Sequence, residues 1–303
     1  MSSVALVDMG SNTVRMNVYN IENNEFQLLF TTKKNLGLAG YIIEDKMSMA
    51  GIKAAIDALF EFQSVTKQFN VDHFVVFATA ALRNVKNSQE AILLIEKETS
   101  TNIHVISGEE EATLDFIGAK KVISSPQGVL VDIGGGSTEI VVFEDNVIVY
   151  AISIPVGSLN LYKKAISHLL PNKKERKTIK KLVNDELDSV KHIFEKEYFS
   201  AIGVGGTIRA GRKLSQSIFD KTKDDNDISI SELKKLIKFI SKDKRENLDV
   251  LLHHVSDRIH TITPGLLILK EVCKRFNTSI LTVSDYGVRE GYLIEHIMNQ
   301  KDE

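Results

Sequence analysis

The chain has 303 residues, a length that suggests either two domains or one large α/β unit. Hydrophobic residues make up 43% of it and charged residues 26%, as is ordinary for a globular protein that buries a sizeable core. The formal net charge is −2, which excludes a global positive field that would attract nucleic acid, so a polyanionic ligand has to be held by local groups.

Two strands joined by a short polar turn are predicted at the start of the chain. Residues 4–8 form an apolar run that ends in Asp8, and residues 14–19 form a second strand. The turn between them contains Gly10, Ser11 and Asn12. This pattern favours a hairpin with a carboxylate at the edge of its turn.

A helix, a strand and a second helix are predicted next. Apolar residues recur at helical spacing over residues 47–69, and residues 71–78 have the composition of a buried strand. Arg83 follows that strand and precedes a helix predicted over residues 88–98. An arginine in this place is able to bind a phosphate with two nitrogens, and a capping or surface role fits it equally well.

Three consecutive glutamates follow a strand predicted over residues 103–106. Ser107 and Glu110 have the spacing of a capping box at the start of a helix. Glu109 is expected to face solvent near the positive end of the helix dipole. Glu111 has no such explanation, and we expect it to be able to point into a cleft. The helix is predicted to reach about residue 123, and the linker-like segment 124–128 then predicts a domain boundary.

A second strand–turn–strand unit occupies residues 128–143, and its turn is rich in glycine. Its polar side chains and glycines are confined to the turn. The residues concerned are Asp132, Gly134, Gly135, Gly136, Ser137, Thr138 and Glu139. Glycines here favour close approach of an anion to backbone N–H groups, although a plain tight turn is the alternative. Carboxylates at both edges of the turn add a possible Mg²⁺ site, because Mg²⁺ prefers oxygen ligands beside phosphate.

The two turns make the sequence internally repetitive. Both have an apolar strand that ends in aspartate, one intervening residue, a glycine and a returning strand. The repeat predicts two similar domains, residues 1–125 and 126–303, whereas coincidence of two hairpins is the alternative. The final helix, over about residues 286–300, is expected to be able to pack back on the first domain.

A third glycine turn follows a strand near residue 200 and precedes a helix predicted from Ile208. Gly205, Gly206 and Thr207 would present free N–H groups at the start of that helix, which suits an anion or nucleotide. Ser158 is a candidate helix N-cap earlier in this half. Strands alternate with helices throughout, which predicts an α/β fold.

The cysteine content and the hydropathy indicate in which cellular compartment the protein is expected. The single cysteine, Cys273, excludes an internal disulfide, and its apolar helical neighbours favour a buried thiol. No apolar run reaches membrane-spanning length, and the N-terminus enters a strand directly. We therefore expect a cytoplasmic protein that contacts neither membrane nor nucleic acid. A monomer and a homodimer are both compatible with the sequence.

Six segments together resemble the exopolyphosphatase/guanosine-pentaphosphate phosphohydrolase (Ppx/GppA) family, which lies among the actin-like and hexokinase-like proteins of ribonuclease H type. They follow the family's order from one end of the chain to the other. The segments are residues 7–13 (VDMGSNT), 78–83 (ATAALR), 106–112 (ISGEEEA), 132–139 (DIGGGSTE), 203–207 (GVGGT) and 284–291 (SDYGVREG).

The resemblance implies a fold and a site. It implies two ribonuclease H-like domains with the active site in the cleft between them. It implies a first phosphate loop at Asp8, Gly10, Ser11 and Asn12, phosphate binding by Arg83, and a catalytic base at Glu111. It also implies a second phosphate loop at Gly134, Gly135, Gly136, Ser137 and Thr138, and a third at Gly205, Gly206 and Thr207. Mg²⁺ or Mn²⁺ would lie near Asp132, Glu139 and Asp8.

Two departures from the family qualify these expectations. Longer members append helical domains, so processive handling of long chains is not expected of this one. Relatives often have Arg-Ala-Asp where this chain has Arg258, Ile259 and His260, so no role is carried over there.

The expected reaction is metal-dependent release of the terminal phosphate from inorganic polyphosphate. Hydrolysis of guanosine pentaphosphate is the alternative. A kinase of the same superfamily and a non-catalytic sensor of polyphosphate or of the nucleotide are further alternatives.

Overall fold

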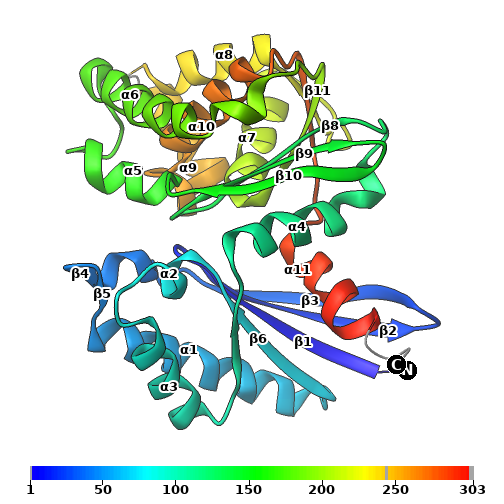
Figure 1. Ribbon diagram of the computed structural model, residues 1–303. Helices are drawn as coiled ribbons and strands as arrows, with labels where there is room; N and C mark the ends of the chain where they lie inside the picture. Colours follow the sequence, from blue (N-terminus) through cyan, green and yellow to red (C-terminus); the bar gives the residue numbers. More distant parts are fainter. Residues whose placement is uncertain (1, 243–244, 300–303) are drawn as a thin grey trace. The chain divides into compact units, whose positions relative to one another are not determined.

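The computed structural model describes residues 2–242 and 245–299, and the chain divides into two compact units. The first unit comprises residues 1–111 and 292–303, and the second comprises residues 112–291. Both divisions fall within helices, at the first turn of α4 (Gly108–Ala119) and at the end of α11 (Val288–Tyr292). The strands and helices of each unit can be followed in Figure 1.

The first unit contains a mixed sheet with α1 (Met49–Gln68) and α3 (Ser88–Thr99) packed on one face. Its strands are β1 (Ser2–Met9), β2 (Val14–Glu22), β3 (Glu25–Lys34), β6 (His73–Ala78) and β7 (Ile103–Val105), with a small separate pair, β4 (Ile42–Ile43) and β5 (Lys46–Met47). Its helices are η1 (Leu38–Tyr41), α1, α2 (Ala80–Arg83) and α3. The main sheet has the order β3-β2-β1-β6-β7, antiparallel over its first three strands and parallel beyond.

The core of the first unit lies between this sheet and helices α1 and α3. Val7 and Val76 of the sheet are buried with Leu59 and Phe62 of α1 and Ile95 of α3. The spacing of the apolar residues in α1 places them on one face, as expected from the sequence. Ser48 caps α1, because its hydroxyl accepts the Gly51 N–H at 3.3 Å.

The end of the chain returns to the first unit. The Tyr292 ring stacks on Phe77 of β6, with ring centroids 4.8 Å apart and planes 13° apart. After Tyr292 the chain forms a π-helical turn over Leu293–Met298. Aromatic pairs of this kind contribute about 0.5–1.5 kcal/mol beyond the area they bury. The last helix is therefore part of the core of a unit whose other elements lie near the start of the sequence.

The second unit repeats the plan of the first. Its strands are β8 (Gly128–Ile133), β9 (Thr138–Glu144), β10 (Val147–Ile154), β11 (Ser200–Val204), β12 (Asp227–Ser229) and β13 (Ile280–Val283). Its helices, besides α4 and α11, are η2 (Lys120–Val122), α5 (Ser158–Ala165), α6 (Lys173–Ser189), η3 (Lys191–Phe194), α7 (Gly205–Ile218), α8 (Ile230–Ile240), α9 (Arg245–Val255), η4 (Ser256–Arg258) and α10 (Ile262–Arg275).

The strand order of the second sheet confirms the predicted repeat. It is β10-β9-β8-β11-β13-β12, and β8, β9 and β10 are antiparallel while β8, β11 and β13 are parallel. The first five strands therefore match the first sheet in order and direction. The α/β prediction is also confirmed.

Both faces of the second sheet are covered. Val129 and Val131 of β8 are buried with residues of α6, α7 and α10, whereas Leu130 is buried with Ala112 and Phe116 of α4. Burial on both faces explains why β8 is apolar at successive positions rather than at alternate ones. Cys273 lies in this core as expected, and burial raises the pKa of its thiol to about 12.

The observed elements agree closely with those expected, with differences of a few residues at their ends. The domain boundary expected between residues 125 and 126 stays a prediction. The compact units described above divide the chain after Glu111 and after Gly291. Among the described residues, no helix is both long enough and apolar enough to cross a membrane.

Candidate active site

The first polar turn, at residues 10–13, has its carbonyl groups held from one side. Ser11 O accepts the Ala39 N–H at 3.0 Å, and Asn12 O accepts the Gly37 N–H at 2.9 Å. In a trans peptide the carbonyl and the following N–H point in opposite directions. The N–H groups after Ser11 and Asn12 therefore point away from residues 37–39, as an anion-binding turn requires.

The glycine turn of the second unit is held in the same way. The carbonyl oxygens of Gly134, Gly135 and Gly136 accept hydrogen bonds of 2.8 to 3.0 Å from residues 158–160 at the start of α5. By the same peptide geometry, the N–H groups of Gly135, Gly136 and Ser137 point away from α5. Three successive N–H groups turned to one side are suited to bind phosphate oxygens.

The two turns also share a hydrogen bond across their base. Gly10 N–H donates to Thr13 O at 3.2 Å, and Gly134 N–H donates to Ser137 O at 3.0 Å. The predicted similarity of the two segments therefore extends to their backbone geometry.

The backbone at Gly157 packs directly against the glycine turn of residues 134–136. A Cβ atom at Gly157 would lie 2.4 Å from the carbonyl carbon and oxygen of Gly135. Gly157, and not the predicted Ser158, is the N-cap of α5, so that prediction was wrong. Ser158 is instead the first helical residue, and its hydroxyl donates to Gly134 O at 3.0 Å.

Arg83 and Glu111 are in contact within the first unit. Arg83 Nη1 donates to Glu111 Oε2 at 2.7 Å and to Ile106 O at 3.1 Å. The two side chains are only 16% and 10% exposed, so the ion pair is screened little by solvent. The sequence selected both residues but did not predict that they touch.

The neighbouring glutamates behave as their spacing predicted. Glu110 N–H donates to Ser107 Oγ at 3.0 Å, and Ser107 N–H donates to Glu110 Oε2 at 3.4 Å, which confirms the capping box. Glu109 is exposed and Glu111 is buried. Of the three, Glu111 is the carboxylate that α4 turns inward.

Asp132 and Glu139 lie side by side in the second sheet. The register pairs Asp132 of β8 with Glu139 of β9, and Glu139 with Ser153 of β10. Directly paired residues share a face of the sheet, so these three side chains form one row. Asp132 is 9% exposed and Glu139 is 1% exposed, and Ser153 Oγ donates to Glu139 Oε1 at 2.7 Å.

Thr138 and Ser137 are more buried than a ligand-binding loop suggests. Thr138 is the first residue of β9, and its hydroxyl donates to Val156 O at 2.5 Å. Its side chain therefore has a structural contact. Ser137 is 3% exposed and closes the turn through its carbonyl oxygen.

Three arginines that sequence reasoning left unassigned lie close together, Arg209, Arg258 and Arg289, and the first two of them lie near Asp132. Burial lowers the pKa of the Arg209 guanidinium, and the charge of Arg289 lowers it further, whereas Asp132 raises it. Burial also lowers the pKa of Arg258, with Asp257 and Asp132 opposing this effect. The three come from α7, η4 and α11, so only the folded chain gathers them.

The third glycine segment forms the first turn of α7, which begins at Gly205 and not at Ile208 as predicted. A Cβ at Gly206 would lie 2.2 Å from Arg258 Nη2, so this guanidinium rests on the helix start. The N-terminus of a helix and an arginine both attract anions. Thr207 is 1% exposed and its methyl group packs against Gly265 of α10.

Replacing Gly205 by alanine is expected to destabilise the protein and to abolish phosphate binding at this turn. Gly205 has φ of +84°, and its Cβ would lie 1.9 Å from Asp132 Oδ1. The control is Gly37→Ala, where φ is +59° and no atom lies within 4 Å of the new Cβ. A left-handed conformation alone costs about 1–2 kcal/mol, so thermal unfolding should show a larger loss for Gly205→Ala. Equal losses would contradict the clash.

The donor set of the second unit fits Mg²⁺ bound together with phosphate. Mg²⁺ usually takes one or two carboxylates and completes its shell with water and substrate oxygens. Asp132 and Glu139 supply two carboxylates, and in the described part of the chain no third acidic, histidine or cysteine ligand joins them in a metal-binding group.

Comparisons with known proteins agree with these features. The model of the Ppx/GppA phosphatase family matches residues 17–300. The chain is 27% identical over 324 residues to a bifunctional 3-dehydroquinate synthase/phosphatase of Fusobacterium nucleatum, a match that covers 98% of this chain and 47% of that protein. It is 23% identical to exopolyphosphatase 1 of Mycobacterium bovis, covering 99% of this chain and 89% of the relative.

A solved structure shows the same fold. The crystal structure of an exopolyphosphatase from Cytophaga hutchinsonii superimposes with a TM-score of 0.86 at 23% identity, over 99% of this chain and 98% of the other. The predicted actin-like and hexokinase-like fold class is thereby confirmed.

Proposed function

The chain belongs to the Ppx/GppA phosphatase family, and we propose that it is an exopolyphosphatase that hydrolyses the terminal phosphoanhydride of inorganic polyphosphate. The observation that carries the proposal is the contact between Arg83 and Glu111, which joins a phosphate-binding cation to a buried carboxylate. The matched polar turns of the two units, each with N–H groups turned to one side, support it.

In the proposed reaction Glu111 accepts a proton from the attacking water. The water oxygen bonds to the terminal phosphorus, the bridging P–O bond breaks, and the shortened polyphosphate leaves together with orthophosphate. Arg83 donates to Glu111 Oε2 and so orients the carboxylate that would accept the proton. Phosphoryl transfer depends mainly on positioning and charge stabilisation, which the turns and Arg83 would supply.

A divalent cation completes the proposal. Mg²⁺ or Mn²⁺ held by Asp132, Glu139 and Asp8 would neutralise charge on the phosphate oxygens. The residues proposed to bind phosphate are Asp8, Gly10, Ser11, Asn12, Gly134, Gly135, Gly136, Ser137, Thr138, Gly205, Gly206 and Thr207. We further propose that the protein works in the cytoplasm.

The experiment that tests this function compares substrates in parallel. Phosphate release is measured with Mg²⁺ from long polyphosphate, short polyphosphate and guanosine pentaphosphate. We expect the highest kcat/KM with polyphosphate. A higher kcat/KM with guanosine pentaphosphate would identify the protein as a hydrolase of that nucleotide instead. ATP-dependent phosphorylation of an acceptor would assign a kinase, and tight binding without phosphate release would assign a sensor.

Removal of divalent metal is expected to stop phosphate release. A chelator would withdraw the cation from the carboxylates proposed to hold it, and excess Mg²⁺ or Mn²⁺ should restore turnover. The measurement is the rate as a function of free Mg²⁺, followed with the thermal unfolding midpoint. Full turnover in the chelator would contradict a metal-dependent reaction.

A further inference from the structure

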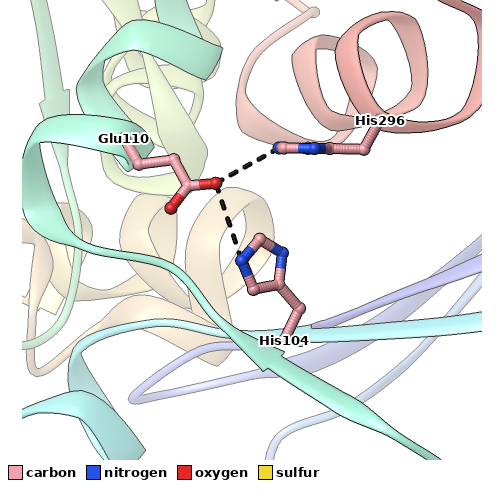
Figure 2. A group of neighbouring side chains, drawn as sticks. All are labelled: His104, Glu110 and His296. Carbon is pink, nitrogen blue, oxygen red and sulfur yellow. Dashed lines mark ion pairs between the residues drawn. The ribbon is translucent and has the colours of Figure 1, made fainter. Parts of the chain in front are cut away.

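Two histidines and a glutamate meet in the first unit, beside the proposed base, because Glu110 directly precedes Glu111. His104 lies on β7, Glu110 in the first turn of α4 and His296 in the π-helical turn at the end of the chain. Figure 2 shows both imidazole rings directed at the Glu110 carboxylate. Within the described chain, this is the one group of three or more histidine, cysteine or acidic side chains with ligand atoms within 4.8 Å of one another.

The distances in this group suit a small metal ion. Glu110 Oε1 lies 3.2 Å from His296 Nε2 and 3.7 Å from His104 Nε2. In a tetrahedral site with bonds of about 2.0–2.1 Å, ligand atoms lie roughly 3.3 Å apart. These two separations fall on either side of that value, and all three ligand atoms lie within 4.8 Å of one another, so side-chain adjustments would bring the three ligands onto one ion.

The ligands are held by their surroundings. Glu110 Oε2 accepts the Ser107 N–H, which leaves Oε1 directed at the imidazoles. His104 Nδ1 lies 3.0 Å from the Tyr292 hydroxyl. When Nδ1–H donates to Tyr292, Nε2 of His104 carries the lone pair that a metal requires.

Hydrogen bonding alone explains the group poorly. A protonated histidine bonds a carboxylate at about 2.7–2.9 Å, shorter than either distance here. His296 Nε2 is buried, and within the described residues it makes no hydrogen bond. A buried polar atom without such a bond is costly unless another partner satisfies it. Two ring nitrogens that converge on one carboxylate oxygen are instead the arrangement of a metal site.

We propose that His104, Glu110 and His296 form a binding site for a transition metal of the Zn²⁺ class, with water as the fourth ligand. Imidazole nitrogen selects Zn²⁺ and similar ions over Mg²⁺, which prefers oxygen. The site is thus distinct in chemistry from the Mg²⁺ site proposed for catalysis. Bound metal would fasten the last turn of the chain to β7 and α4 within the first unit.

The test is Zn²⁺ binding to the full chain after chelator treatment, measured by isothermal titration calorimetry. We expect one equivalent of Zn²⁺ and a rise in the thermal unfolding midpoint. His104→Gln, His296→Gln and Glu110→Gln should each weaken binding by more than about 10–100-fold, the range for loss of an outer partner alone. Glu110→Gln keeps an oxygen for the Ser107 N–H, so it removes the charge with little effect on the cap.

Controls separate this site from other histidines and from the catalytic residues. His253 and His254 form a second histidine pair, with ring centroids 4.7 Å apart, and a His253→Gln, His254→Gln variant should bind Zn²⁺ as the parent does. An Asp132→Asn, Glu139→Gln variant should also bind one equivalent of Zn²⁺. Circular dichroism without metal shows whether each variant is folded. Absence of Zn²⁺ binding by the parent, or unchanged binding by folded His104→Gln and His296→Gln, would overturn the proposal.

Discussion

Replacing Glu111 by glutamine is expected to reduce phosphate release from polyphosphate by about 10²–10⁴-fold, the contribution typical of a well-placed general base. Glutamine has the size of glutamate, and its amide oxygen is able to accept the hydrogen bond from Arg83 Nη1. The substitution therefore removes basicity while the packing around a side chain only 10% exposed is retained. The effect should appear in kcat, with KM and the unfolding midpoint changed little.

Glu109 provides the matched control for this prediction. It lies in the same helical turn, is exposed, and carries the same charge, so Glu109→Gln should release phosphate at the parent rate. Substrate affinity measured separately for Glu111→Gln distinguishes loss of the base from loss of binding. If Glu110→Gln were the inactive variant and Glu111→Gln remained active, the base would have to be reassigned.

Replacing Asp132 by asparagine is expected to have the second largest effect, on both turnover and stability. The change removes one proposed metal ligand and the negative charge that Arg209 and Arg258 experience. A buried positive charge that loses a compensating negative charge destabilises the folded state, so we expect the free energy of unfolding to fall as well. Turnover should fall by about 10²–10³-fold, as when one group that stabilises transition-state charge is removed.

The experiment for Asp132→Asn combines chemical unfolding with turnover over a range of Mg²⁺ concentrations. Asp145→Asn is the control, because Asp145 is exposed at the β9–β10 turn and has φ of 51°, which asparagine also accepts. The variant could instead lose stability and yet keep the parent's turnover per folded molecule and its Mg²⁺ dependence. That result would show that Asp132 has a purely structural role.

Local patterns were sufficient to predict much of the fold. The repeated strand, aspartate and glycine pattern predicted two similar sheets, because alternation of strands and helices together with short turns constrains strand order. The capping box at Ser107 and Glu110 was predictable, since both partners lie within one helical turn. Burial of Glu111 followed by elimination once its two neighbours had been explained.

Long-range contacts were beyond sequence reasoning. Arg258 lies in a short helical turn where the chain departs from the family's Arg-Ala-Asp pattern, and only the fold brings its guanidinium onto Gly206. His104 and His296 are separated by most of the chain, so no metal-ligand spacing marks them. The requirement for glycine at position 157 was not predicted for the same reason. Only a residue without a Cβ fits there, because the backbone of the glycine turn, remote in sequence, packs against it. In each case the partner is close in space and remote in sequence.

The stacking of Tyr292 on Phe77 has a consequence for biosynthesis. Phe77 leaves the ribosome early, whereas Tyr292 emerges only when the whole second unit has been synthesised. Until then, the nascent first unit exposes an aromatic face that the completed molecule covers. The second unit is continuous over residues 112–291, so we expect its contacts to be completed before those of the first unit, although the first unit begins to be translated earlier.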